Sequence, residues 1–153
     1  MQFFSSPSRL APLAAAAFAL ALFAAPAAAQ EAEMIEGTTL DGASFIAPAQ
    51  WVVGEPLTVS GQGWVNSAGT TGSVIGVKYD QGTVVPAEPV DEMDDIWLRI
   101  TASSDGSWSA NLPYPDDAGW AAGESHRVHL LTGLLGVNDI ARNPVITVTL
   151  VAP

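Results

Sequence analysis

The 153-residue sequence contains no cysteine, which limits how the chain can be stabilised and anchored. Small exported domains usually rely on disulfides, so a domain without them depends on its hydrophobic core. The absence also excludes the lipid-modified cysteine that anchors many bacterial lipoproteins. We therefore expect a domain that folds through apolar packing and carries no lipid anchor.

Basic residues are scarce: five Lys and Arg stand against 16 Asp and Glu, which gives a formal net charge of −11. Nucleic acid and anionic membrane surfaces repel a chain this acidic, so neither is an expected partner. The charge suits a soluble extracellular protein, a cationic partner or bound calcium.

Histidines and catalytic motifs are also scarce. The two histidines, His126 and His129, are three residues apart, which on a strand directs them to opposite faces. The sequence has no G-x-S-x-G motif, and nothing in it singles out a pair of carboxylates as a glycosidase site. We expect His126 to be a structural hydrogen-bonding residue, and we expect no enzymatic activity.

A long apolar run does occur near the N-terminus. Arg9 precedes a stretch rich in alanine and leucine over residues 10–26, and Ala27-Ala-Ala29 follows it. A cationic region, an apolar region and a small-residue cleavage site in this order are typical of a secretory signal peptide. A transmembrane anchor is the alternative, although the run is at the short limit for spanning a bilayer. The sequence thus predicts a signal peptide over residues 1–29, its cleavage, secretion, and no membrane insertion afterwards.

The rest of the chain is long enough for one domain. Residues 30–42 are polar and acidic without periodicity, and we interpret them as a flexible acidic leader. Residues 43–153 carry short β-type runs separated by clusters of Gly, Pro, Asn and Asp, without a sustained helical period. This pattern predicts an all-β antiparallel sandwich of about seven strands.

The expected strands follow the alternation of apolar and polar residues. In one of them the alternation directs Ile96, Leu98 and Ile100 into the core. Trp97 and Arg99 are then expected side by side on the outer face. The predicted strand ranges are 43–46, 57–61, 73–80, 95–102, 107–112, 127–131 and 145–151.

Several of these segments resemble the immunoglobulin-like modules of bacterial secreted and surface proteins, in particular the repeats of actinobacterial (corynebacterial) cell-surface proteins. The resemblance covers about residues 43–153 and implies an immunoglobulin-like sandwich with a binding or adhesion role. Surface proteins of this kind often have a C-terminal sorting signal, which is not seen after the last strand, so we expect no covalent attachment to the wall. The matching segments are Ala43-Ser-Phe-Ile-Ala-Pro48, Gly54-Glu-Pro-Leu-Thr-Val-Ser-Gly-Gln-Gly-Trp64, Gly72-Ser-Val-Ile-Gly-Val-Lys-Tyr-Asp-Gln-Gly82, Asp105-Gly-Ser-Trp-Ser-Ala-Asn-Leu-Pro-Tyr-Pro115, Ala122-Gly-Glu-Ser-His-Arg-Val-His-Leu-Leu-Thr-Gly133 and residues 145–151.

Tryptophan supplies the ligand-binding candidates, because exposed indole rings stack on sugars and form protein hot spots. Trp97 and Arg99 are expected to share a contact patch. Trp51 and Trp120 are placed in loops, where they either bind a ligand or plug the open ends of the sandwich.

The densest acidic run offers oxygen ligands to a metal ion. Asp91, Glu92, Asp94 and Asp95 lie just before a predicted strand, and calcium prefers such ligands. A second acidic pair is Asp116-Asp117. The run lacks EF-hand spacing, and the alternative is a solvated loop that protects a strand edge, so no cofactor is expected apart from this calcium hypothesis.

Taken together, these features predict a secreted, non-catalytic binding or adhesion module that is extracellular or non-covalently associated with the bacterial cell surface. Its partner would be a protein or an envelope glycan. The alternatives are a carbohydrate-binding module that uses exposed tryptophans and a structural envelope protein that self-associates.

Overall fold

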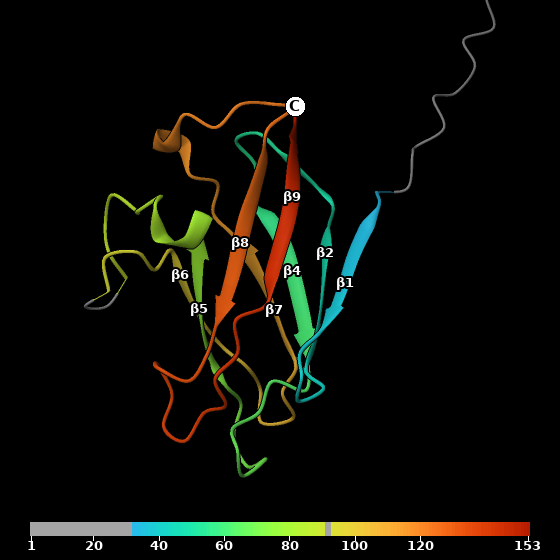
Figure 1. The fold of residues 1–153 in the computed structure, drawn as a ribbon, viewed down its shortest axis with the longest axis vertical. Coiled ribbons are helices and arrows are strands. Elements are labelled where there is room, and N and C mark those ends of the chain that lie inside the picture. The colour runs from blue at the N-terminus through green and yellow to red at the C-terminus, as the bar shows by residue number, and fades with distance from the viewer. Residues whose placement is uncertain (1–31, 91–92) are drawn as a thin grey trace, which may run out of the picture. The chain divides into compact units, whose positions relative to one another are not determined.

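The computed structural model describes residues 32–90 and 93–153, which fold into two β-sheets (Figure 1). The expected signal peptide, residues 1–29, lies outside the described residues. No helix within the described ranges is long and apolar enough to cross a membrane.

One sheet has four strands in the order β1-β2-β4-β7, and the other has five in the order β3-β9-β8-β5-β6. All pairs are antiparallel except β3–β9, which is parallel. The prediction of an all-β fold is therefore confirmed. The strands are β1 (Met34–Thr38), β2 (Ser44–Pro48), β3 (Gln50–Val52), β4 (Leu57–Gln62), β5 (Val74–Tyr79), β6 (Leu98–Thr101), β7 (Trp108–Leu112), β8 (Ser125–Leu131) and β9 (Val145–Val151), with single 3₁₀ turns at Asp80–Gly82 and Asp116–Ala118.

Strand β1 corrects the expectation of a flexible leader over residues 30–42. Residues 34–38 pair with β2 in an antiparallel register that runs from Met34 opposite Pro48 to Thr38 opposite Ser44. The turn between the two strands closes through a hydrogen bond from the backbone N–H of Thr39 to the carbonyl oxygen of Ala43, 2.7 Å long. This strand is hard to detect from the sequence because Ile35 is its only half-buried large side chain.

Strand β3 places in the core a tryptophan, Trp51, for which the sequence predicts a loop position. After Pro48 the chain leaves the four-stranded sheet, and Gln50–Val52 joins the edge of the five-stranded sheet beside β9. Trp51, in the middle of this short strand, is 1% exposed. One continuous segment therefore belongs to both sheets.

The main core lies between the two sheets, and most of its members are the inward residues that the alternation predicts. Burying apolar side chains of this size contributes about 25 cal/mol per Å² removed from water. The core therefore supplies the stability that this cysteine-free chain needs. Its fully buried large side chains include Val59, Trp64, Ile75, Val77, Tyr79, Leu112, Val128, Leu130, Ile146, Val148 and Leu150.

Ile96 departs from the predicted alternation. Leu98 and Ile100 lie opposite Val77 and Ile75 in the β5–β6 ladder, as expected for core residues. Ile96 instead lies on the outer face of the five-stranded sheet, where a Cβ added to Gly76 would come within 2.9 Å of its Cδ1 atom. The strand begins only at Leu98, so the period of two cannot be extended back to Ile96.

Candidate binding groove

The two ends of the sandwich differ in chemistry, and the candidate site is at the end that holds the C-terminus. The segments that follow β5 and β7 lie at this end (Figure 1). Both segments contribute aromatic side chains that pack on Trp51 or on Tyr79.

Five large aromatic side chains form a cluster around Trp51 and Tyr79, whose ring centroids are 5.6 Å apart in an edge-to-face arrangement. Tyr114 and Trp120 contact Trp51 at 5.6 and 5.8 Å. Trp97 contacts Tyr79 at 5.0 Å. Edge-to-face and offset geometries at these separations are favourable for aromatic pairs, so the rings hold the loops of this end together.

The polar atoms of the two central side chains, Trp51 and Tyr79, are bonded within the protein. Trp51 donates its indole N–H to the carbonyl oxygen of Glu55 at 2.6 Å, and Tyr79 donates its hydroxyl to that of Pro113 at 2.7 Å. Burial raises the pKa of the Tyr79 phenol far above its ordinary value, so it stays protonated as a donor.

The polar atoms of Trp97 and Tyr114 also form hydrogen bonds with backbone carbonyls. The indole N–H of Trp97 donates to the carbonyl oxygen of Val84 at 2.8 Å. The hydroxyl of Tyr114 donates to the carbonyl oxygen of Trp120 at 3.0 Å. The parts of these two rings that remain accessible are therefore their apolar surfaces.

Trp97 and Tyr114 line a groove with a volume of about 480 Å³. One side of it is the apolar segment that includes Val84, Val85 and Pro86, and the other is the 3₁₀ turn Asp116–Ala118. Val85 is 56% exposed, and both aspartates are exposed. Burial raises the pKa of the Tyr114 phenol, and the negative charges of Asp116 and Glu124 raise it further. The groove thus combines aromatic and aliphatic walls with a negative rim.

The four predicted ligand-binding residues separate in the structure. Trp97 lines the groove, whereas Trp120 is half-buried in the aromatic cluster and Trp51 is fully buried. Arg99 lies opposite Gly76, on the outer face of β6, and donates to the carbonyl oxygen of Leu135 at 3.2 Å. The expected patch of Trp97 with Arg99 is therefore wrong, because Trp97 packs toward the core at the residue before the strand begins.

Sequence reasoning missed most of the groove wall. Val84, Val85 and Pro86 follow no strand or helix period, and Tyr114 stands out in the sequence only as part of a proline-rich loop. The sequence does single out Trp97 and the acidic pair Asp116-Asp117, and both belong to the groove lining.

The predicted calcium run is only partly within the described residues, because Asp91 and Glu92 lie outside them. Asp95 forms an ion pair with Lys78, and Asp94 is exposed. No group of three metal-ligating side chains is present in residues 32–90 and 93–153. Calcium binding by this run stays a prediction.

The two histidines have separate environments. His126 stacks on Trp120 at a centroid separation of 3.8 Å and an angle of 14°. Its Nδ1 lies 2.8 Å from Oδ2 of Asp80, and its Nε2 lies 3.3 Å from Oε2 of Glu124. The pKa of Glu124 is lowered by the N–H donated from Ala121 and by the contact with His126. This arrangement at the start of β8 matches the expected structural role.

His129 is buried on β8, with Nδ1 3.1 Å from Oδ1 of Asn143. Its Nε2 has no hydrogen-bond partner within the described part of the chain. His129 shares a pocket with Lys78 and Gln81, apart from the groove residues, so the two histidines do not converge on one site.

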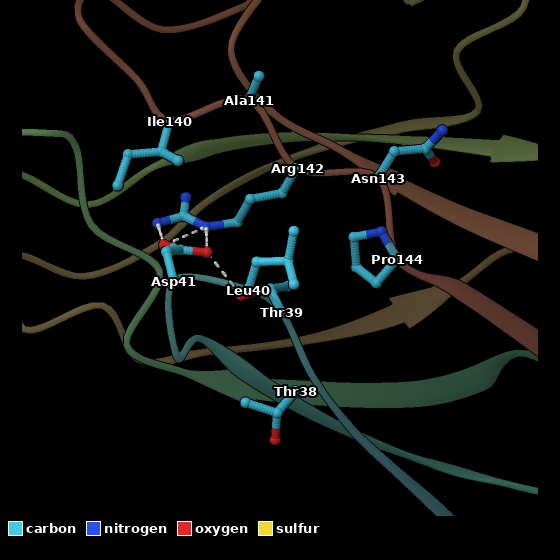
Figure 2. A pocket seen from close by; sticks show the side chains of 9 residues that line it. All are labelled: Thr38, Thr39, Leu40, Asp41, Ile140, Ala141, Arg142, Asn143 and Pro144. Atoms are coloured by element: carbon cyan, nitrogen blue, oxygen red, sulfur yellow. Dashed lines mark hydrogen bonds and ion pairs between the residues drawn. The ribbon is translucent and has the colours of Figure 1, made fainter.

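The opposite end of the sandwich has a pocket of about 360 Å³ between the β1–β2 turn and residues 140–144. Figure 2 shows Asp41 and Arg142 facing each other there. Arg142 donates from Nε to both carboxylate oxygens of Asp41, at 3.1 and 2.9 Å, and from Nη2 to Oδ2 at 2.5 Å. The guanidinium lowers the pKa of Asp41.

The Arg142 guanidinium also contacts groups other than Asp41. Its Nη1 donates to the hydroxyl of Ser73 at 2.9 Å, its Nη2 donates to the carbonyl oxygen of Val65 at 3.0 Å, and its guanidinium lies 5.5 Å from the ring centroid of Trp64. The Ser73 hydroxyl donates in turn to Asp139 at 2.7 Å. The charged groups of this pocket are therefore occupied with one another, and the groove at the other end is the better candidate for a ligand.

No protein-family model matches the chain, and comparisons with curated proteins and with solved structures find no similar protein.

Proposed function

We propose that this protein is a secreted, non-catalytic, immunoglobulin-like binding module that engages a partner at or near the bacterial cell surface through the Trp97–Tyr114 groove. The observation that carries the proposal is the groove itself, with two aromatic side chains in its wall and two exposed carboxylates on its rim. Concave sites with mostly apolar walls and a few convergent polar groups are the usual form of ligand pockets.

The strand order supports the immunoglobulin-like assignment. In that fold, strands A, B and E belong to one sheet, and strands G, F and C belong to the other, with C′ added in variable-type domains. The sheets β2-β4-β7 and β9-β8-β5-β6 follow these orders. The chain departs from the pattern in two places, since β1 precedes the first strand and no strand D separates β6 from β7.

The sequence supports secretion. A cationic residue, an apolar run and Ala27-Ala-Ala29 occupy the first 29 residues, in the order of a signal peptide. The acidic composition is compatible with a soluble extracellular domain.

The chemistry of the groove supports binding rather than catalysis. The Tyr114 hydroxyl and the Trp97 indole N–H both donate to backbone carbonyls, so neither is directed at a substrate. Asp116 and Asp117 are adjacent in one turn and exposed. The walls therefore offer contact surface, which is what recognition of a protein or an envelope glycan needs.

The test is co-sedimentation of the purified protein, expressed from the full chain, with isolated bacterial envelopes in calcium and in chelator. We expect retention of the wild type and loss of retention for Val85→Lys, which fills the groove from an exposed position. Val137→Lys is the matched control, because Val137 is 87% exposed and lies outside the groove lining.

Retention of Val85→Lys at the wild-type level would contradict binding through the groove. The absence of wild-type retention in both buffers would contradict a partner on the envelope.

A further inference from the structure

We propose that the groove recognises an organic cation, the side-chain ammonium or guanidinium group of a basic segment on a partner protein. This inference rests on the proposed binding role of the groove and names the chemistry that it selects.

The aromatic walls suit a cation. The polar atoms of Trp97 and Tyr114 are used inside the protein, so the rings present their aromatic carbon surface to the groove. A Lys or Arg head group near a Trp or Tyr face is attracted by the ring quadrupole. The methylene stem of such a side chain would pack on Val85 and Pro86, as long basic side chains do on apolar surfaces.

The rim carboxylates are available to a ligand, unlike most aspartates of this domain. No side chain in the described ranges donates a hydrogen bond to Asp116 or Asp117. Five other aspartates each accept from a neighbouring side chain: Asp41 from Arg142, Asp80 from His126, Asp95 from Lys78, Asp105 from Ser107 and Asp139 from Ser73. The groove therefore holds negative charge that the protein itself leaves unneutralised.

The local charge favours a cation over an anion or a neutral sugar. Among the described residues that line the groove there is no Lys, Arg or His, and the pKa of Tyr114 is raised by burial and by the negative charge of Asp116. A neutral sugar gains from the aromatic walls but nothing from the charge. A cation gains from both, and the acidic chain around the groove adds long-range attraction for a basic partner.

The Asp41–Arg142 pocket at the opposite end is less suited to a cation than the groove. Asp41 there is already paired with Arg142, whose side chain is 1% exposed, so a cationic ligand would have to displace a buried partner. Of these two pockets, only the groove offers a cation both an aromatic wall and a free carboxylate.

The experiment follows the indole N–H resonance of Trp97 by NMR while short glycine-flanked peptides are added to the protein, expressed from the full chain. One peptide carries lysine, one arginine and one acetyl-lysine, and methyl glucoside is the neutral sugar probe. We expect saturable shifts with the two cationic peptides and none with acetyl-lysine or the glucoside.

Variants sharpen the test. Asp116→Asn with Asp117→Asn is expected to weaken binding of the cationic peptides about tenfold, because it removes two charges within a few ångströms of the site. Glu33→Gln with Glu36→Gln changes the net charge equally at exposed positions outside the groove lining and is expected to weaken binding less than about twofold.

Equal shifts with lysine and acetyl-lysine, a response to the glucoside alone, or no response to any probe would overturn cation recognition. Envelope retention separates this failure from that of the proposed function. If the Asp116→Asn/Asp117→Asn protein still sediments while Val85→Lys does not, the groove binds its partner by contacts other than charge.

Discussion

The two ends of the sandwich hold their loops with different chemistry. At one end Arg142 joins the β1–β2 turn, the loop after β4 and the segment before β9 through Asp41, Val65 and Ser73. At the other end, contacts among aromatic rings and hydrogen bonds to backbone carbonyls connect the loops, and His126, stacked on Trp120, adds contacts with the carboxylates of Asp80 and Glu124.

This difference in bonding determines which end has charged groups that are free to bind a ligand. Ionic contacts neutralise both members, so the Arg142 end has paired charge and a closed network. Aromatic contacts use ring faces and edges rather than charges, and no side chain of the described residues pairs with Asp116 or Asp117, so the aromatic end keeps a groove with free negative charge. Predictions on each end test this contrast.

The largest effect is expected from Arg142→Ala. The substitution would leave Asp41 and the buried Asp139 without their cation, and breaking a buried pair on one side costs about 3–5 kcal/mol. Urea denaturation of the variant measures the change in the free energy of unfolding. Arg127→Ala is the control at an exposed position, with an expected change within about 0.5 kcal/mol. Equal effects of the two variants would mean that the ionic end is not a stabilising network.

A smaller effect is expected from Tyr79→Phe at the aromatic end. The ring remains in the cluster, but the carbonyl oxygen of Pro113 loses the hydroxyl that donates to it at 2.7 Å. Tyr79 is fully buried and Pro113 is exposed, so the loss is that of one hydrogen bond, about 1 kcal/mol. The same denaturation experiment measures it. A loss as large as that of Arg142→Ala would show that the hydroxyl, rather than ring packing, holds this end.

The smallest effect is the pH dependence of the Asp41–Arg142 pair. The pKa of Asp41 is lowered from its ordinary value of 3.8, so the pair contributes its full stability above that value. This contribution is lost as pH falls through the lower folded-state pKa. The difference in unfolding free energy between wild type and Asp41→Asn should therefore be constant near neutral pH and shrink below about pH 4. A difference that grows on acidification would contradict the assignment.

The sequence predicts the strands well where one face is buried, and less well elsewhere. Residues 145–151 alternate cleanly because every second side chain enters the core. Strand β1 lies at a sheet edge with mostly exposed side chains, so its composition resembles that of a loop. Strand β3 is three residues long, which is too short to show an alternation of apolar and polar residues.

The groove was harder to predict than the strands. The alternation predicts Trp97 on the outer face beside Arg99, but Trp97 precedes the strand and packs on Tyr79, and it lines the groove for that reason. Asp41 and Arg142 are 101 residues apart in the chain, so no local pattern connects them. Asp41 and Arg142 come into contact only when the two sheets have assembled.

Strand β3 also has a mechanical consequence. It runs parallel to β9, with Gln50 opposite Thr149 and Val52 opposite Val151. When force pulls the N-terminal side of β3 against the C-terminal side of β9, the hydrogen bonds between them are loaded together in shear. The β1–β2 hairpin, by contrast, has Met34 opposite Pro48, so the same force opens it one bond at a time from that end. Tension along the chain would thus peel β1 from the hairpin early, whereas the β3–β9 pair would resist as a unit.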